Sequence, residues 1–190
     1  MNHTPRFTVV GAGHGGKAMA AHLALMGFPT VLQNRTVDRI RAIQQRGGID
    51  LEAPEGGPRG FAQLEMATGN MQEAVEHADM IMVVVPSSAH ADIARAVAPF
   101  LKDGQHVVLH PGRTCGAIEF YKILRDHNCT ADVVVSEAET FIYASRSDGP
   151  AQARIFRIKE AVPLAALPSN RTEETLEIIH QAYPQFINGG

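Results

Sequence analysis

The sequence lacks several features that would mark other classes of protein. It has no dense run of lysine or arginine, and no apolar run near the roughly 20 residues that span a bilayer. With a formal net charge of −3, it gives no case for a nucleic-acid partner or a membrane surface. Its two cysteines, Cys115 and Cys129, are too few for a disulfide framework or a metal site. Because the polar residues 1–6 lead into a strand pattern without a signal peptide, we expect a cytoplasmic protein with reduced thiols.

The chain instead alternates short apolar runs with longer amphipathic stretches. Its 190 residues and 45% hydrophobic content fit one domain, or one domain with a short appendage. Strands are expected at residues 7–10, 30–33, 80–85, 105–109, 131–135, 154–158 and 162–167. Helices are expected at residues 15–26, 37–46, 71–78, 88–101, 117–127 and 172–183. This order predicts an α/β fold with a doubly wound, mostly parallel sheet of the Rossmann type.

Residues 49–67 interrupt this alternation. They contain Pro54, Pro58 and several glycines, flanked on both sides by short stretches with apolar residues. Proline and glycine in this density are typical of turns. We therefore predict a hairpin-like excursion at the edge of the sheet rather than a linker.

The first predicted strand ends in the segment G-A-G-H-G-G, and an alanine-rich helix follows. Gly11, Gly13 and Gly16 have the G-x-G-x-x-G spacing of a dinucleotide-binding loop. Gly11 would allow the tight turn, Gly13 the close approach of the backbone to a pyrophosphate, and Gly16 the close packing of helix on strand. The helix N-terminus would offer N–H groups and partial positive charge to a phosphate. The candidate cofactor loop comprises Gly11, Ala12, Gly13, His14, Gly15 and Gly16.

The end of the second strand bears on which dinucleotide binds. NAD sites usually place Asp or Glu about 20 residues after the glycines, where the carboxylate binds the ribose hydroxyls. This chain has Asn34 there, followed by Arg35 and Thr36. A neutral Asn34 does not repel a 2′-phosphate, Arg35 can pair with it and Thr36 can donate a hydrogen bond, so we expect NADP as the preferred cofactor, with NAD possible. The alternative is that Thr36 only caps the next helix and Arg35 is a solvated side chain.

Two other nucleotide-dependent classes fit the residues less well. Gly11, Gly13 and Gly15 match the looser G-x-G-x-G pattern of methyltransferases, but those proteins too are expected to carry an acid at the end of the second strand. Short-chain reductases need a Tyr-x-x-x-Lys pair for proton transfer. Tyr121 is followed directly by a lysine, and Tyr143 has Ser147 four residues on, so this reading fails.

Loops at the carboxyl ends of the later strands supply further candidates, because ligands of doubly wound sheets bind there. Val85, Pro86 and Ser87 close a wholly apolar strand, where the nicotinamide ribose would pass. Arg113 could pair bidentately with a substrate carboxylate, or form an ion pair that fixes its own loop. Glu139 could bind a substrate ammonium, or make structural hydrogen bonds. No catalytic acid or base is identified among these residues.

Five segments together have a distinctive pattern. They are V-V-G-A-G-H-G-G at residues 9–16, N-R at 34–35, V-P at 85–86 with His90, H-P-G-R-T at 110–114, and E-A-E-T at 137–140. These segments resemble the octopine/nopaline (opine) dehydrogenase family. That family belongs to a wider group with ketopantoate reductase, glycerol-3-phosphate dehydrogenase and 6-phosphogluconate dehydrogenase.

The resemblance implies an NAD(P)-dependent oxidoreductase that acts on a CH–NH or CH–OH substrate, with this chain as its cofactor-binding half. Residues 1–168 would form the dinucleotide-binding domain. Residues 169–190 would be a linker and the first helix of a helical second domain, otherwise absent, which in the family supplies a His–Asp pair for the proton. The alternative is a stand-alone dinucleotide-binding module without turnover, which docks to or regulates a partner. A small-molecule substrate is expected in the first case, and a second copy or a partner chain could cover the surface that the helical domain would hide.

Overall fold

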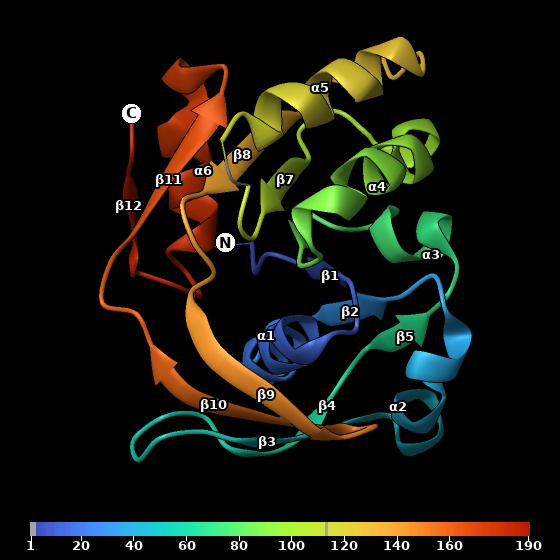
Figure 1. The fold of residues 1–190 in the computed structure, drawn as a ribbon, viewed down its shortest axis with the longest axis vertical. Coiled ribbons are helices and arrows are strands. Elements are labelled where there is room, and N and C mark those ends of the chain that lie inside the picture. The colour runs from blue at the N-terminus through green and yellow to red at the C-terminus, as the bar shows by residue number, and fades with distance from the viewer. Residues whose placement is uncertain (1–2, 113) are drawn as a thin grey trace.

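The computed structural model describes residues 3–112 and 114–190, and these residues form two sheets flanked by helices (Figure 1). The larger sheet contains β1 (Phe7–Val10), β2 (Thr30–Gln33), β5 (Met66–Thr68), β6 (Met80–Val83), β7 (His106–Leu109), β8 (Val134–Ala138), β11 (Val162–Leu167) and β12 (Phe186–Asn188). The smaller sheet contains β3 (Gly48–Glu52), β4 (Gly60–Gln63), β9 (Tyr143–Gly149) and β10 (Gln152–Ile158). The α-helices are α1 (His14–Leu25), α2 (Arg41–Arg46), α3 (Met71–Val75), α4 (His90–Val97), α5 (Gly116–Asp126) and α6 (Thr172–Ile179). Short 3₁₀ turns lie at η1 (Val37–Arg39), η2 (Ser87–Ala89), η3 (Ala98–Phe100) and η4 (Ser169–Arg171).

The larger sheet confirms the predicted Rossmann-type fold. Its strand order is β12-β11-β8-β7-β6-β1-β2-β5, and the six strands from β8 to β5 run parallel. Strands β1, β6 and β7 are buried along their whole length, as strands covered on both faces must be. β11 runs antiparallel to β8, and β12 pairs parallel with β11 at the sheet edge.

Helix α1 lies between the two sheets (Figure 1). It packs against β1 and β2 on one side and against all four strands of the smaller sheet on the other. Ala18, Ala20 and Ala21 have no exposed surface, and their small side chains allow this double contact. Gly27 has a φ of +92° just beyond the helix, which confirms the predicted left-handed stop.

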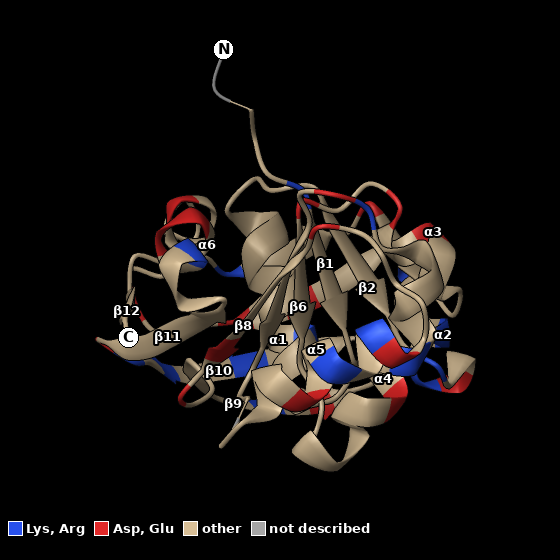
Figure 2. Ribbon diagram, turned by 90° about the horizontal axis from the view of Figure 1, so that it is seen from above, with Lys and Arg blue, Asp and Glu red and all other residues tan. Residues whose placement is uncertain are grey.

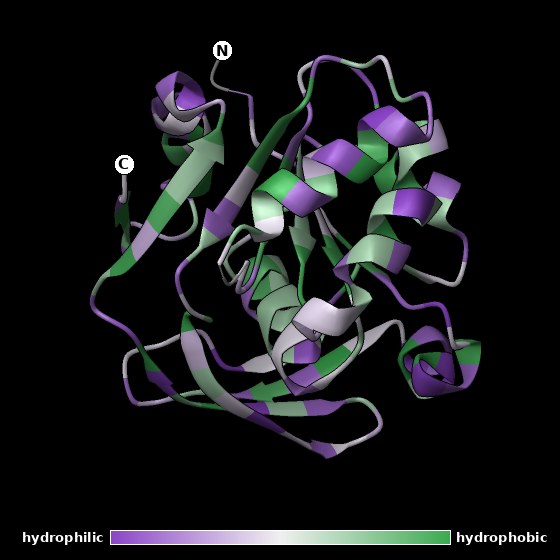
Figure 3. Ribbon diagram, turned by 45° about the horizontal axis from the view of Figure 1, so that its top comes forward, coloured by the Kyte–Doolittle hydropathy of each residue, from purple (hydrophilic) through white to green (hydrophobic). Residues whose placement is uncertain are grey.

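Helices α3, α4 and α5 cover the opposite face of the larger sheet. A second core cluster there joins strand residues such as Val83 and Val107 to Ala94, Phe120 and Leu124 of the helices. Figure 3 shows apolar strands in the interior and polar positions on the outer sides of α4 and α5. Charges of both signs are spread over the helices while the central strands carry almost none (Figure 2). Within the described residues, no helix has the length and apolar character needed to cross a bilayer.

The predicted hairpin at 49–67 forms, but its predicted place at the edge of the main sheet is wrong. β3 and β4 pair antiparallel and then join β10 and β9 in the smaller sheet. The reason is the apolar face of the hairpin, because Ile49, Leu51 and Ala62 are buried in the core cluster that includes α1. Only β5, at the end of this segment, returns to the edge of the larger sheet beside β2.

Three strands near the C-terminus differ from the sequence expectation. β8 begins three residues later than predicted, at Val134, and β9 occupies part of a segment expected to be a loop. β12 was not expected at all. After the buried Tyr143, exposed and partly buried residues alternate along β9, and most of them are polar. The sequence therefore has no apolar run that would indicate this strand.

Residues 169–190 pack onto the larger sheet. Leu176 and Ile179 of α6 are buried, and Phe186 of β12 pairs with Val162 of β11. α6 and β12 therefore share a core cluster with β8 and β11. The division into residues 1–168 and 169–190, with a helical second domain, stays a prediction.

A buried polar cluster joins α1, β9 and the segment after α6. The Tyr143 hydroxyl donates to the Tyr183 hydroxyl at 2.8 Å and lies 3.0 Å from His22 Nδ1. The His22 ring stacks on Tyr183, with centroids 5.8 Å apart. Burial lowers the pKa of His22 to about 4, so its ring is neutral at pH 7.

This burial predicts a loss of stability in mild acid. Burial lowers the pKa of His22 to about 4 and that of His110 to about 3, against 6.5 for an ordinary histidine. Between pH 6.5 and 4 the unfolded chain binds protons that the folded chain does not, so the stabilisation is complete above pH 6.5 and falls on acidification. Each histidine should lower the free energy of unfolding by about 2 kcal/mol between pH 7 and pH 5, measured by urea denaturation. The His22→Gln variant, which cannot titrate there, should lose the part of this dependence that His22 contributes, about 2 kcal/mol, and an unchanged dependence would contradict the prediction.

Candidate functional site

The glycine loop after β1 is shaped by contacts that only glycine permits. Gly11 has a φ of +111°, and a Cβ there would lie 2.4 Å from the Val84 carbonyl oxygen. A Cβ on Gly16 would lie 1.7 Å from the Gly11 carbonyl oxygen, so α1 starts in direct contact with the loop. At Gly13, by contrast, no heavy atom lies within 4 Å of the Cβ position. Gly11 and Gly16 are therefore tightly packed, whereas Gly13, at the start of the helix, is open.

Asn34 holds the other side of this loop. Its Oδ1 accepts the Ala12 backbone N–H at 2.9 Å, and its Nδ2 donates to the Thr36 carbonyl at 2.9 Å. One residue earlier, the Gln33 carbonyl accepts the Gly11 N–H at 2.8 Å. The side chain of Asn34 thus fixes the loop geometry, a role that sequence spacing did not indicate.

Arg35 and Thr36 lie at the end of β2, beside the loop. The Arg35 side chain is 85% exposed, and its Nη1 lies 3.7 Å from Asp92 Oδ2 on α4. Thr36 precedes η1 and makes no side-chain capping hydrogen bond to it. Thr36 therefore lacks the side-chain hydrogen bond that a helix cap would make. The Arg35 side chain is exposed to solvent and accessible to a ligand.

Val85, Pro86 and Ser87 border the loop from the side of β6. The Val84 N–H donates to the Val10 carbonyl at 2.8 Å, which places the following residues against Gly11. A Cβ on Gly11 would meet Val85 Cγ1 at 2.7 Å. Pro86 and Ser87 are exposed, and Pro86 is the N-cap position of η2, without a side-chain hydrogen bond. The structure thus brings the predicted residues after β1, β2 and β6 together at one edge of the sheet.

The start of α1 is tied to the end of β9. His14 Nδ1 accepts the Ser147 backbone N–H at 2.9 Å. One turn on, Lys17 Nζ donates to Ser147 Oγ at 3.1 Å and to the Gly149 carbonyl at 3.2 Å. Burial, with the nearby Arg39 charge, lowers the pKa of Lys17. Sequence analysis missed Lys17 and Ser147, because their partners become visible only once β9 is known.

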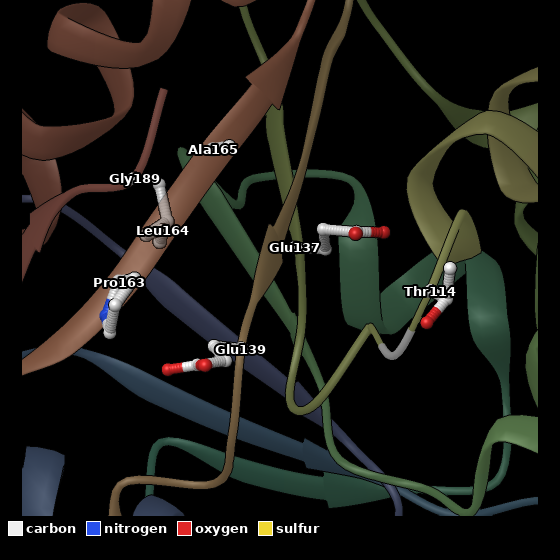
Figure 4. Close-up of a pocket in the computed structure, with 7 residues that line it drawn as sticks. All are labelled: Thr114, Glu137, Glu139, Pro163, Leu164, Ala165 and Gly189. Atoms are coloured by element: carbon white, nitrogen blue, oxygen red, sulfur yellow. The ribbon is translucent and has the colours of Figure 1, made fainter.

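A cavity of about 500 Å³ lies near the carboxyl end of β8. Figure 4 shows Glu137 pointing toward the loop of Thr114, and Glu139 pointing toward β11. Glu137 Oε2 accepts the Ala117 N–H of α5 at 2.7 Å, which is a structural role. Glu139 is exposed and lines the cavity with Thr114, Glu137, Pro163, Leu164, Ala165 and Gly189. The other predicted substrate residue, Arg113, lies outside the described residues.

His90 and His110 follow β6 and β7 but are both turned inward. They are 1% and 2% exposed, and His110 Nε2 lies 3.2 Å from Met82 Sδ. Burial lowers the pKa of both rings. Neither histidine presents a ring to the cavity. Among residues 3–112 and 114–190, no group of three or more His, Cys, Asp or Glu side chains is placed to hold a metal ion.

Comparison with known proteins identifies relatives with two related activities. Residues 6–112, more than half of the chain, match the family model described as the NAD-dependent glycerol-3-phosphate dehydrogenase N-terminus. The chain is 38% identical over 187 residues to an opine dehydrogenase of Arthrobacter sp. (strain 1C), covering 98% of this chain and 51% of that protein. It is 39% identical over 102 residues to a glycerol-3-phosphate dehydrogenase [NAD(P)+] of Stenotrophomonas maltophilia (strain R551-3), covering 54% of this chain and 29% of that protein.

Among solved structures, octopine dehydrogenase with NADH and L-arginine is similar in fold. The TM-score is 0.81 at 20% sequence identity, and the match covers 97% of this chain and 48% of octopine dehydrogenase. The chain thus spans about half the length of the two opine-type proteins. The matched part of octopine dehydrogenase has a fold similar to that of this chain.

The unequal crowding of the glycines predicts unequal effects of alanine. Gly16→Ala forces a methyl group onto the Gly11 carbonyl and should lower the free energy of unfolding by about 1–3 kcal/mol. Gly13→Ala has open space and should change the free energy of unfolding by less than about 1 kcal/mol, because the loss of a favourable N-cap residue opposes the gain from a less flexible unfolded chain. Urea denaturation of the two variants measures both values. Equal stability of the two would show that the contact between α1 and the loop is not tight.

Proposed function

This chain belongs to the family of NAD-dependent glycerol-3-phosphate dehydrogenase N-terminal domains, and we propose that it is the cofactor-binding half of an opine-dehydrogenase-like oxidoreductase. Its substrate would carry a CH–NH or CH–OH group that exchanges a hydride with the nicotinamide ring. The observation that carries the opine-type assignment is the sequence identity over nearly the whole chain. The opine dehydrogenase is 38% identical over 98% of this chain, whereas a glycerol-3-phosphate dehydrogenase that aligns with 94% of it is 26% identical.

The pyrophosphate would bind at the glycine loop. Free space at Gly13 supports this, because the backbone of the loop can approach a ligand there without obstruction. The first N–H groups of α1 have no partners within the helix, and the helix dipole places partial positive charge beside them. His14 would contribute through its backbone N–H, since its ring is engaged with Ser147.

The adenosine end would lie at the end of β2, with NADP preferred and NAD accepted. Three features support this preference. Asn34 supplies no carboxylate, its side chain is already bonded to the loop, and Arg35 is exposed beside it. The Arg35 guanidinium would hold a 2′-phosphate and Thr36 would donate a hydroxyl hydrogen bond.

The nicotinamide end would pass Val85, Pro86 and Ser87, and the substrate would enter the cavity beside β8. When bound, the cofactor supplies or accepts the hydride. Glu139 would attract a substrate ammonium, and Arg113 would pair with a substrate carboxylate. We assign the acid/base for the accompanying proton to none of the described residues, because His90 and His110 are buried away from the cavity.

A cytoplasmic location and an associated chain complete the proposal. Cys115 and Cys129 are free thiols, as expected in a reducing compartment. Ile118 of α5 and Ile187 of β12 are 57% and 45% exposed, on elements next to the cavity. Exposed apolar side chains in this place support a second copy or a partner domain that covers the substrate side.

The alternative function is a dinucleotide-binding module without turnover, and it predicts a different result in an activity assay. Oxidation of NADPH or NADH by this chain, with a 2-oxo acid and an amino acid present, would eliminate the binding-only hypothesis. Tight cofactor binding without oxidation of NADPH or NADH would favour it.

Titration of the chain with NADPH and NADH tests the proposal directly. Both cofactors should bind saturably to the wild-type chain. The Gly13→Ala variant should raise the dissociation constants of both cofactors about tenfold. The reason is that a methyl group would displace the pyrophosphate from the backbone N–H groups, whose charge-assisted hydrogen bonds are worth about 1.5–3 kcal/mol. The stability of this variant, measured as above, is the control. If neither cofactor binds to the wild-type chain, the proposed function is wrong.

The Arg35→Ala variant tests the assignment of the 2′-phosphate. NADPH binding should weaken about tenfold or more, because the variant loses a charge-assisted pair, while NADH binding should change less than about threefold. Arg157→Ala is a matched control, since Arg157 is 75% exposed and lies in the smaller sheet. An equal loss for both cofactors would refute the role of Arg35.

A further inference from the structure

Asp92 on α4 is shared between two arginines. Its Oδ2 lies 3.7 Å from Arg35 Nη1, and its Oδ1 lies 3.1 Å from Arg95 Nη1. The pair with Arg95 is local, three residues apart on one helix, whereas the pair with Arg35 joins α4 to the end of β2. Figure 2 shows acidic and basic positions next to each other on α4.

The strand order explains why these two residues meet. β1 lies between β2 and β6, Arg35 follows β2, and α4 follows β6. Arg35 and Asp92 therefore face each other across the carboxyl end of β1, next to the glycine loop. A ligand group that binds Arg35 at this place would lie near the carboxylate of Asp92.

We propose that Asp92 is a specificity-determining residue that limits the preference for NADP by competing with the 2′-phosphate for Arg35. This inference rests on the proposed function, because it needs a dinucleotide at the glycine loop. The Asp92 carboxylate attracts the Arg35 guanidinium at Nη1, so a 2′-phosphate must compete with it for the same positive charge. The ribose 2′-hydroxyl of NADH is uncharged and does not compete with Asp92 for Arg35. Asp92 therefore weakens NADPH binding and leaves NADH binding unchanged.

Two other roles for Asp92 predict different effects of its removal. If Asp92 only stabilises α4 through Arg95, its removal changes stability and not cofactor selectivity. If it repels the phosphate directly, without Arg35, its removal strengthens NADPH binding even when Arg35 is absent. A double-mutant cycle separates these roles from competition for Arg35.

The experiment measures equilibrium dissociation constants for NADPH and NADH in four proteins: wild type, Asp92→Asn, Arg35→Ala and the double variant. Asp126→Asn is the matched control, because Asp126 is also a half-exposed helix carboxylate paired with a basic residue, Lys122. It makes the same change in net charge but lies at the far end of α5. Urea denaturation of each variant accompanies the titrations.

Asp92→Asn should tighten NADPH binding about twofold to fivefold, within the range expected from freeing an exposed ion pair, and change NADH binding less than about twofold. In the Arg35→Ala background the same substitution should change NADPH binding less than twofold. The gain should shrink between 0.1 M and 1 M salt, because the screening length falls from about 10 Å to about 3 Å.

Three results would overturn the inference while the proposed function stands. They are an Asp92→Asn variant that behaves like Asp126→Asn, an equal gain for both cofactors, and a gain that persists without Arg35. A wild-type chain that binds neither cofactor would overturn the proposed function, and this inference with it.

Discussion

The contact between Gly16 and the carbonyl oxygen of Gly11 is the constraint on which the rest of the structure depends. It brings the first turn of α1 against the end of β1, closer than any side chain would allow. The helix then continues between two sheets, where its alanines contact strands on both sides. A larger residue at this point would push α1 away from the loop and strain the packing of the smaller sheet together with the loop itself.

Three separate parts of the chain hold the loop that this contact creates. Gln33 and Asn34 bond to it from the end of β2, Val84 borders it directly after β6, and Ser147 of β9 bonds to the first turn of α1. Each support comes from backbone groups or short side chains. The loop is therefore fixed before a ligand arrives, and a rigid, preorganised site loses less entropy on binding.

Much of the site could be predicted from sequence because its signals are local. The glycine spacing, the Asn34-Arg35-Thr36 triplet and the wholly apolar β6 are each contained within a few residues. The smaller sheet could not be predicted, since β3 pairs with β10 from far along the chain and β9 alternates polar with partly buried positions. For the same reason three contacts have no sequence signature. They are the bond from Asn34 to Ala12, the bond from Lys17 to the end of β9, and the approach of Asp92 to Arg35. They depend on which strands become neighbours.

The smaller sheet also has a consequence for how the chain must fold. Its hairpin β3–β4 is made early in synthesis, but β10, to which β3 pairs, is made only after four more strands of the larger sheet. Until then Ile49 and Leu51 have incomplete cover, and on its second side α1 can contact only β3 and β4 of the smaller sheet. Pairings of such high sequence separation slow folding, and transiently exposed apolar surface invites association with other chains. In a nascent chain, α1 is therefore fully enclosed only after the last third of the sequence has been synthesised.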